Sequence, residues 1–160
     1  MFSFRSIQLN EVMKKNEPTL TLSLTVNDGN AALEFYTQAF GAKELYRMPM
    51  PDGSVAHAEM MIGNTKVYLS EGCPEWHCAP MPEGVQASCL FGLNIESCDD
   101  SFAQAVSAGG VPLTEPADQP WGSRSAMIRD PYGYRWSLSQ FIEEVSPEEM
   151  CRRMKALTEA

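Results

Sequence analysis

The chain has 160 residues, 44% of them hydrophobic, and a formal net charge of −9 at pH 7. This length suits one domain with a substantial hydrophobic core, and the hydrophobic content argues against disorder except at the ends. The acidic balance argues against nucleic acid and anionic membranes as partners, because phosphate groups bind basic surfaces.

The chain is expected in the cytoplasm. No apolar run approaches the roughly 18 residues that a membrane-spanning helix needs. The N-terminal segment, "MFSFRSIQLNEVMKKNEP", lacks the continuous apolar region of a secretory signal. The five cysteines are an odd number, which fits reduced thiols better than a disulfide framework.

The elements follow one another in a regular order. Residues 1–18 are predicted to form an N-terminal arm, and residues 19–145 one domain. In this domain, "LTLSLTV" alternates apolar and polar residues, which predicts a strand. An amphipathic helix follows, with Asp28 or Asn30 as its N-cap and Gly41 as its stop. Three further strands follow, the last two joined by a turn at Gly63 and Asn64.

The second half repeats the first. The segment 22–42 aligns without a gap to 91–111, 69 positions later, and Tyr68 then corresponds to Ser137. Ser97 or Asp99 is predicted to cap the second helix. The chain therefore contains two βαβββ modules, at about 19–72 and 86–141. A C-terminal helix is predicted over residues 146–160, where "SPEEM" supplies an N-cap, a proline and early acidic residues.

The alternation of the strands also predicts a ligand-facing surface. With one helix per module, the apolar face of each sheet must be covered by the helix. The opposite face carries Thr, Ser, Gly and Leu, which suits the lining of a cavity better than open solvent. Pairing Ile62 with Thr65 places Glu59 opposite Tyr68, so His57 shares this face. The equivalent register in the second hairpin places Ala126 beside Ser137, and Arg124 beside Ser139.

Several candidate residues have alternative interpretations. His57 and Glu59 are a polar anchor, an acid–base pair, two ligands of a displaced metal, or a hydrogen-bonded pair without a ligand. Trp121 stacks on a planar ligand or fills the mouth of the cavity. Arg124 binds a carboxylate or phosphate, or pairs with Glu59 or Asp130. The segment "CPEWHC" would need more ligands to bind zinc, so a proline-rich loop is favoured.

The paired modules resemble the glyoxalase/bleomycin-resistance/dioxygenase superfamily, also called vicinal oxygen chelate proteins, and most of all its PhnB-like branch. The resemblance rests on "VNDGNAALEFYTQAFGA", "HAEMMIGNTKVYLSE", "PWGSRSAMIRDPYGYRWSL" and "SPEEMCRRM". It covers roughly residues 19–155. It implies an α+β fold in which two βαβββ modules form a cupped, partly closed mixed sheet around a ligand cavity, commonly in a homodimer.

The resemblance also identifies four positions where metal-dependent members carry histidine or glutamate. In this sequence they are Thr21, Tyr68, Leu90 and Ser137. None is a normal ligand for a divalent cation, which prefers imidazole, carboxylate or thiolate. We therefore expect no metal cofactor in the usual place, and whether the chain is an enzyme stays open at this point.

The resulting hypothesis is a cytoplasmic, homodimeric protein that binds a small molecule without a metal. The expected ligand-binding residues are Thr21, Ser23, His57, Glu59, Tyr68, Leu90, Trp121, Arg124 and Ser137. The alternative is a lyase, isomerase or dioxygenase-like enzyme that uses a relocated metal near His57 and Glu59. In a third hypothesis, side chains fill the cavity and leave an interaction module.

Overall fold

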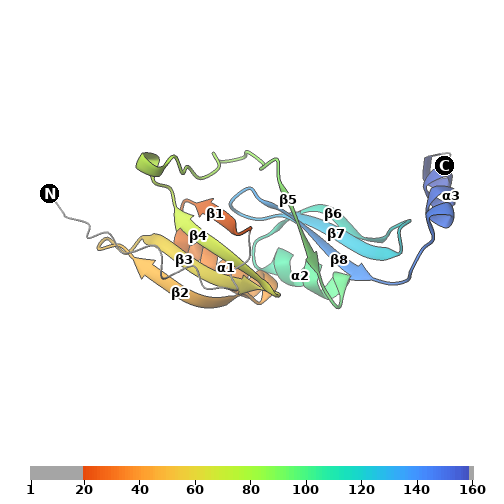
Figure 1. Cartoon of the computed structure of the whole chain (residues 1–160), viewed down its shortest axis with the longest axis horizontal. Helices are drawn as coiled ribbons and strands as arrows, with labels where there is room; N and C mark the ends of the chain where they lie inside the picture. Colours follow the sequence, from red (N-terminus) through yellow and green to blue (C-terminus); the bar gives the residue numbers. More distant parts are fainter. Residues whose placement is uncertain (1–19, 159–160) are drawn as a thin grey trace.

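Two β–α–β–β–β modules follow one another along the chain in the computed structural model (Figure 1), which describes residues 20–158. The predicted arm of residues 1–18 lies outside the described residues. The first module consists of β1 (Leu22–Val26), α1 (Gly29–Phe40), β2 (Lys43–Pro49), β3 (Val55–Ile62) and β4 (Thr65–Glu71). The second consists of β5 (Leu90–Asn94), α2 (Cys98–Ser107), β6 (Val111–Asp118), β7 (Ser123–Arg129) and β8 (Arg135–Phe141). A short 3-10 helix, η2 (Pro74–Trp76), lies between the modules, and α3 (Pro147–Thr158) follows them.

Each module forms its own four-stranded mixed sheet. The strand orders are β1-β4-β3-β2 and β5-β8-β7-β6, so the repeat in the sequence is also a repeat in topology. The first strand of each module runs parallel to the last, and the other pairs are antiparallel. The sheets lie side by side along the long axis of the molecule (Figure 1) and are not closed into a barrel. The predicted α+β fold is confirmed.

The alternation of side chains determines which face of each sheet is buried. In β1, Leu24 and Val26 are fully buried. In the neighbouring β4, Leu69 is fully buried and Val67 nearly so. Helix α1 packs over this face and contributes the fully buried Tyr36. Burial of these apolar side chains supplies the main favourable free energy of folding. The opposite face of this sheet is partly exposed.

The helix boundaries follow from local chemistry. The Asp28 side chain accepts a hydrogen bond from the Ala31 backbone N–H at 2.9 Å, and Ser97 caps α2 in the same way. Gly41 ends α1 with a left-handed φ of +64°, which glycine adopts without a steric penalty. The first-named N-cap of each predicted pair is therefore the one observed.

One of the two predicted hairpin registers is correct. In the first hairpin, Ile62 pairs with Thr65 and Glu59 with Tyr68, as predicted. In the second, Ser137 pairs with Met127 and not with Ala126, so that prediction is wrong by one residue. The loop has five residues, 130–134, because the Asp130 carboxylate accepts a hydrogen bond from the Tyr134 N–H at 2.9 Å and holds that residue outside the ladder.

The buried carboxylate of Asp130 joins the two modules. Its Oδ2 accepts hydrogen bonds from the Tyr36 hydroxyl of α1 at 2.7 Å and from the Trp136 indole N–H of β8 at 2.9 Å. Its Oδ1 accepts from the backbone N–H groups of Tyr132 and Tyr134, each at 2.9 Å. Burial raises the pKa of Asp130, although these four hydrogen bonds oppose the shift. This side chain therefore connects the first helix to the last hairpin.

Helix α3 extends away from both sheets at one end of the molecule (Figure 1). Its stripe of Met150, Met154 and Leu157 does not pack on the body: Met154 is 44% exposed and Leu157 66%. The helix is tied to the preceding segment by an ion pair between Arg153 and Glu143 at 2.8 Å. None of the helices in residues 20–158 is long and apolar enough to cross a membrane.

The Asp130→Asn substitution tests this junction. An amide nitrogen cannot accept a hydrogen bond, so two of the four buried or partly buried donors lose their acceptor. We expect the free energy of unfolding to fall by about 2–4 kcal/mol, as measured by urea denaturation. Tyr36→Phe removes one donor, leaves the carboxylate in place and should cost about 1–2 kcal/mol. An Asp130→Asn protein that unfolds at the same urea concentration as the native protein would contradict the role of Asp130 in joining the modules.

Candidate functional site

The polar face of the first sheet carries a compact group of ionisable and aromatic side chains. Ser23 of β1 and Glu59 of β3 lie directly on either side of Tyr68 in β4. The ring of His57 meets that of Tyr68 edge to face, with 5.0 Å between the ring centroids. Thr21 precedes β1 and lies two residues before Ser23, as residues on the same face of a strand do. The strand pairing thus brings together the first-module residues that the sequence predicted.

A shared carboxylate organises the charges on this face. Glu59 Oε1 lies 3.6 Å from His57 Nε2, and Glu59 Oε2 lies 3.4 Å from Lys66 Nζ. The three side chains are only 22–32% exposed, so screening by solvent is incomplete. Glu59 therefore has a cationic partner in Lys66 besides the imidazole. This balance suits an anchor for a polar ligand better than a free general base.

Sequence reasoning missed two members of this group, Lys66 and Tyr46. Lys66 lies two residues before Tyr68 in β4, on the same face of the strand, so the alternation of that strand could have identified it. Tyr46 comes from β2, where it pairs with Glu59, and its ring centroid lies 6.4 Å from that of His57. The pairing of β2 with β3 contains two register shifts, which no simple alternation predicts.

The corresponding face of the second sheet is small and neutral at its centre. Ser137 of β8 lies between Gly92 of β5 and Met127 of β7. Leu90, at the start of β5, is 46% exposed and pairs with Arg135. Ser137 and Leu90 thus belong to the polar face, as predicted.

The prediction that Arg124 lies beside Ser139 on the ligand-facing surface is wrong. Because the register of the second hairpin is shifted by one residue, Arg124 pairs with Gln140 and lies on the helix-covered side. Its guanidinium donates to Asp99, in the first turn of α2, at 2.6 and 2.8 Å, and to Asp118 at 2.9 Å. Neither carboxylate is a partner that the sequence predicted. The two ion pairs raise the pKa of Arg124 further above its already high value and make it a structural residue.

Trp121 lies in the turn between β6 and β7 and is 49% exposed. The next residue, Gly122, is close to the segment after β8, because a Cβ atom there would clash with the Glu143 carbonyl oxygen. Trp121 therefore sits beside the start of the C-terminal extension. Its ligand-stacking role stays a prediction.

The four residues that the resemblance assigns to a metal site do not suit a divalent cation. Thr21, Tyr68, Leu90 and Ser137 offer two aliphatic hydroxyls, a phenol and a hydrocarbon. Across residues 20–158, no three His, Cys, Asp or Glu side chains are grouped as a metal site requires. The "CPEWHC" segment instead forms a tight loop, in which the Cys73 N–H donates to the Cys78 carbonyl at 2.9 Å.

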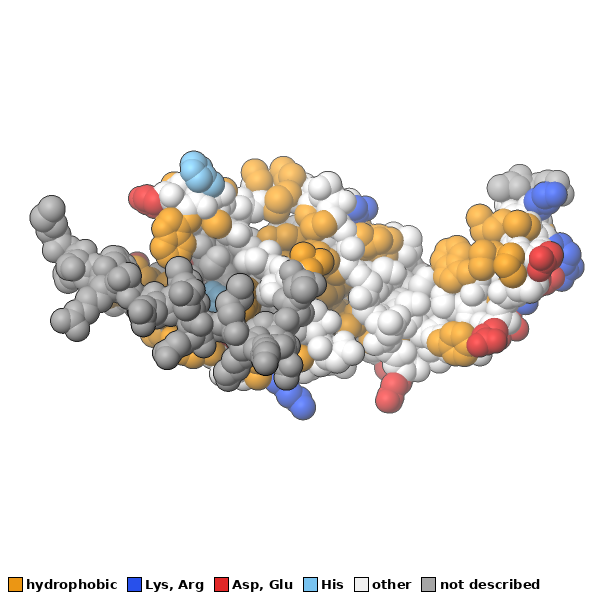
Figure 2. All heavy atoms as spheres, in the orientation of Figure 1, with side chains coloured by type: hydrophobic (Ala, Val, Ile, Leu, Met, Phe, Trp, Pro, Cys, Tyr) orange, Lys and Arg blue, Asp and Glu red, His pale blue; other side chains and the backbone are white. Residues whose placement is uncertain are grey.

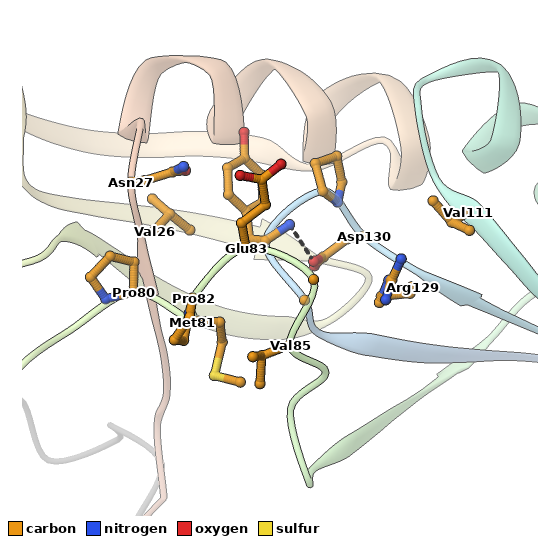
Figure 3. A pocket seen from close by; sticks show the side chains of 14 residues that line it. Val26, Asn27, Pro80, Met81, Pro82, Glu83, Val85, Val111, Arg129 and Asp130 are labelled. Carbon is orange, nitrogen blue, oxygen red and sulfur yellow. Dashed lines mark hydrogen bonds between the residues drawn. The ribbon is translucent and has the colours of Figure 1, made fainter.

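The larger of two described cavities lies at the junction of the modules and has a volume of about 480 Å³ (Figure 3). Its wall comes from the end of β1, the proline-rich segment 80–85, and the loop between β7 and β8. A smaller cavity of about 300 Å³ adjoins Glu71 and the segment 78–80. Neither cavity is lined by the residues that the sequence predicted to bind a ligand.

Comparisons with known proteins agree on one family. The sequence pattern of the Glyoxalase/Bleomycin resistance protein/Dioxygenase superfamily matches residues 18–138. An uncharacterised protein of Mycobacterium bovis is 35% identical over 144 residues, which are 88% of this chain and 94% of that protein. Lactoylglutathione lyase of Arabidopsis thaliana is 26% identical over 143 residues, 88% of this chain but only 50% of that enzyme.

Solved structures share the fold. TioX from a Micromonospora species superposes with a TM-score of 0.61 at 21% identity, covering 79% of this chain and all of TioX. The fosfomycin resistance protein FosX from Mesorhizobium loti has a TM-score of 0.57 at 17% identity, covering 84% of this chain and 98% of FosX. At these identities the likeness concerns the fold alone, and it does not distinguish the PhnB-like branch.

The side chains of Thr21, Tyr68, Leu90 and Ser137 predict that the purified protein contains little bound divalent metal. We expect protein purified without a chelator or a metal-binding tag to contain less than stoichiometric Zn, Ni, Fe or Mn. Mass spectrometry of the metals measures this, and protein incubated with each ion and then desalted serves as the loaded comparison. About one ion per chain, lost in His57→Ala, would contradict the prediction and favour a relocated metal.

Proposed function

Because the chain belongs to the glyoxalase/bleomycin resistance protein/dioxygenase superfamily, we propose that it binds a small molecule on the polar faces of its sheets, without the superfamily's usual metal. The observation that carries the proposal is the group formed by His57, Glu59 and Tyr68. These residues are held in place by strand pairing and by contacts with one another. They retain capacity for a ligand, since the Tyr68 hydroxyl has no hydrogen-bond partner among the described residues.

The proposed ligand-binding residues come from both sheets, and Arg124 is no longer among them. They are Thr21, Ser23, His57, Glu59, Tyr68, Leu90, Trp121 and Ser137. Aromatic rings and small hydroxyl side chains among a few polar anchors are typical of small-molecule sites. Binding of this kind would serve sequestration of a toxic compound, the role that resistance proteins of this superfamily suggest.

An enzyme with a relocated metal is the alternative proposal. His57 Nε2 and Glu59 Oε1, 3.6 Å apart, would supply two of its ligands, and further ligands would have to come from the substrate, from water or from outside the described residues. Glu59 is already shared with Lys66, which weakens it as a ligand. The metal measurement above decides between the two proposals.

We also propose that the protein is a cytoplasmic homodimer whose chains meet at the C-terminal end. Five large apolar side chains are exposed there: Trp121 at 49%, Phe141 at 71%, Ile142 at 51%, Met154 at 44% and Leu157 at 66%. Figure 2 shows hydrophobic side chains gathered on α3 and beside it at this end of the molecule. A second copy would cover this surface and give α3 the packing partner that the described chain does not provide.

Ligand binding is tested by a thermal-shift screen of metabolites and antibiotics on the whole protein, because a ligand that binds only the folded state raises its melting temperature. We expect a confirmed ligand to bind His57→Ala and Tyr68→Phe at least about tenfold more weakly, since each loses a buried polar contact. His77→Ala is the matched control, since His77 lies in an exposed loop. Ligands that bind all three variants equally well would contradict the proposed site.

Dimerisation is tested by removing residues 146–160 and measuring mass in solution by light scattering. We expect two chains per particle for the whole protein and a shift to one chain after truncation. Arg152→Gln, on an exposed position of the same helix, should remain dimeric and serves as the control. A monomeric whole protein at high micromolar concentration would contradict the proposal.

A further inference from the structure

Two arginines face each other across the second sheet. Arg129 of β7 is the direct partner of Arg135 of β8, on the same face as the Met127–Ser137 pair. Directly opposed side chains in a ladder have their Cβ atoms about 4.5–5.5 Å apart, and like charges in this position are destabilising. A nearby anion would offset this repulsion.

Every other arginine in the described residues has a carboxylate partner. Arg47 pairs with Glu44, Arg124 with Asp99 and Asp118, Arg152 with Glu149, and Arg153 with Glu143 and Glu149. The Arg129 side chain makes no hydrogen bond or ion pair within the described residues. Arg135 donates from Nη2 to the Ser88 carbonyl at 2.9 Å, and its buried Nε has no acceptor there. In a protein with a net charge of −9, two adjacent cations without a carboxylate are unexpected.

The internal repeat explains how this charge became unbalanced. Arg135 corresponds to Lys66 of the first module, 69 positions earlier. Lys66 is neutralised by Glu59, which lies opposite Tyr68. In the second module, the residue opposite Ser137 is Met127. The carboxylate that balances the first cation thus has no counterpart beside the second.

The large cavity provides the space for a ligand. Arg129 lines it next to Val111, while Asn27 and Pro80 lie on its other side (Figure 3). Two carboxylates also contribute to the wall. Asp130 is committed to its four hydrogen bonds, and Glu83 forms no ion pair with Arg129 within 4.0 Å. A volume of about 480 Å³ is within the range of sites for metabolite-sized molecules.

We propose that Arg129 and Arg135 bind the oxyanion of a small molecule, a carboxylate or a phosphate, whose remaining part occupies this cavity. The inference goes beyond the proposed function, because the residues proposed there do not line this cavity. It names a second binding place and the chemical class of its ligand. Guanidinium groups bind such anions through parallel N–H···O hydrogen bonds. One anion between the two side chains would remove their repulsion.

The test uses the whole protein with two probes, inorganic phosphate and benzoate, each compared with chloride at equal ionic strength. We expect at least one probe to raise the melting temperature beyond the effect of chloride, and calorimetry then gives its dissociation constant. Arg129→Gln and Arg135→Gln should each weaken binding at least about tenfold. Arg47→Gln, which removes the same charge from an existing ion pair, should bind the probe as the native protein does.

Lysine substitutions separate binding from folding. Arg129→Lys and Arg135→Lys keep the charge and the packing stem but lose the planar fork, so they should fold and bind the anion with intermediate affinity. The inference is wrong if neither probe stabilises the native protein more than chloride, or if the glutamine variants bind as tightly as it does. In either case a neutral ligand that depends on His57 and Tyr68 would still support the proposed function.

Discussion

The structure depends on one buried carboxylate. Asp130 receives four hydrogen bonds, two from side chains on different modules and two from its own loop. The same loop reaches β1 through Tyr134, whose hydroxyl accepts from the Thr25 N–H at 3.0 Å and donates to the Thr25 carbonyl at 3.1 Å. Because a buried donor without an acceptor is costly, α1, β1 and β8 can satisfy their polar groups only in this relative arrangement. A helix, a strand end and a hairpin are thereby held as one unit.

The two modules have the same topology but different surface chemistry. Their shared strand order follows from a repeated pattern of apolar residues, which tolerates changes on the other face. On that face the first module has Glu59 between His57 and Lys66, a nearly balanced set of charges. The second has Ser137 and Met127 at its centre and an uncompensated arginine pair at its edge. The two copies of one scaffold therefore differ in charge: the glutamate and lysine of the first module offset each other, whereas the arginine pair of the second has no carboxylate partner among the described residues.

The fold could be predicted from the sequence because it depends on local signals. The period of two in β1 indicated its buried face, and the Gly63-Asn64 turn determined the pairing of Glu59 with Tyr68. The second hairpin could not be predicted in the same way. Its loop is one residue longer than a simple turn at 130–133, because the Asp130 side chain binds the Tyr134 N–H. This hydrogen bond can be recognised only once the Asp130 carboxylate is placed in the core. The longer loop shifts the register by one residue, which places Arg124 on the helix-covered face.

The position of the large cavity could not be predicted from the sequence either. Val26, Pro80 and Tyr132 are far apart in the chain and line one space only because Asp130 fixes the last hairpin against the first module. No periodicity within a strand contains that information, since it depends on packing between modules. The polar face of each sheet is a property of its own sequence, whereas the space next to Arg129 is a property of the junction. The carboxylate that closes the core therefore also shapes the space beside Arg129, so the stability of the core and the shape of this cavity share one structural cause.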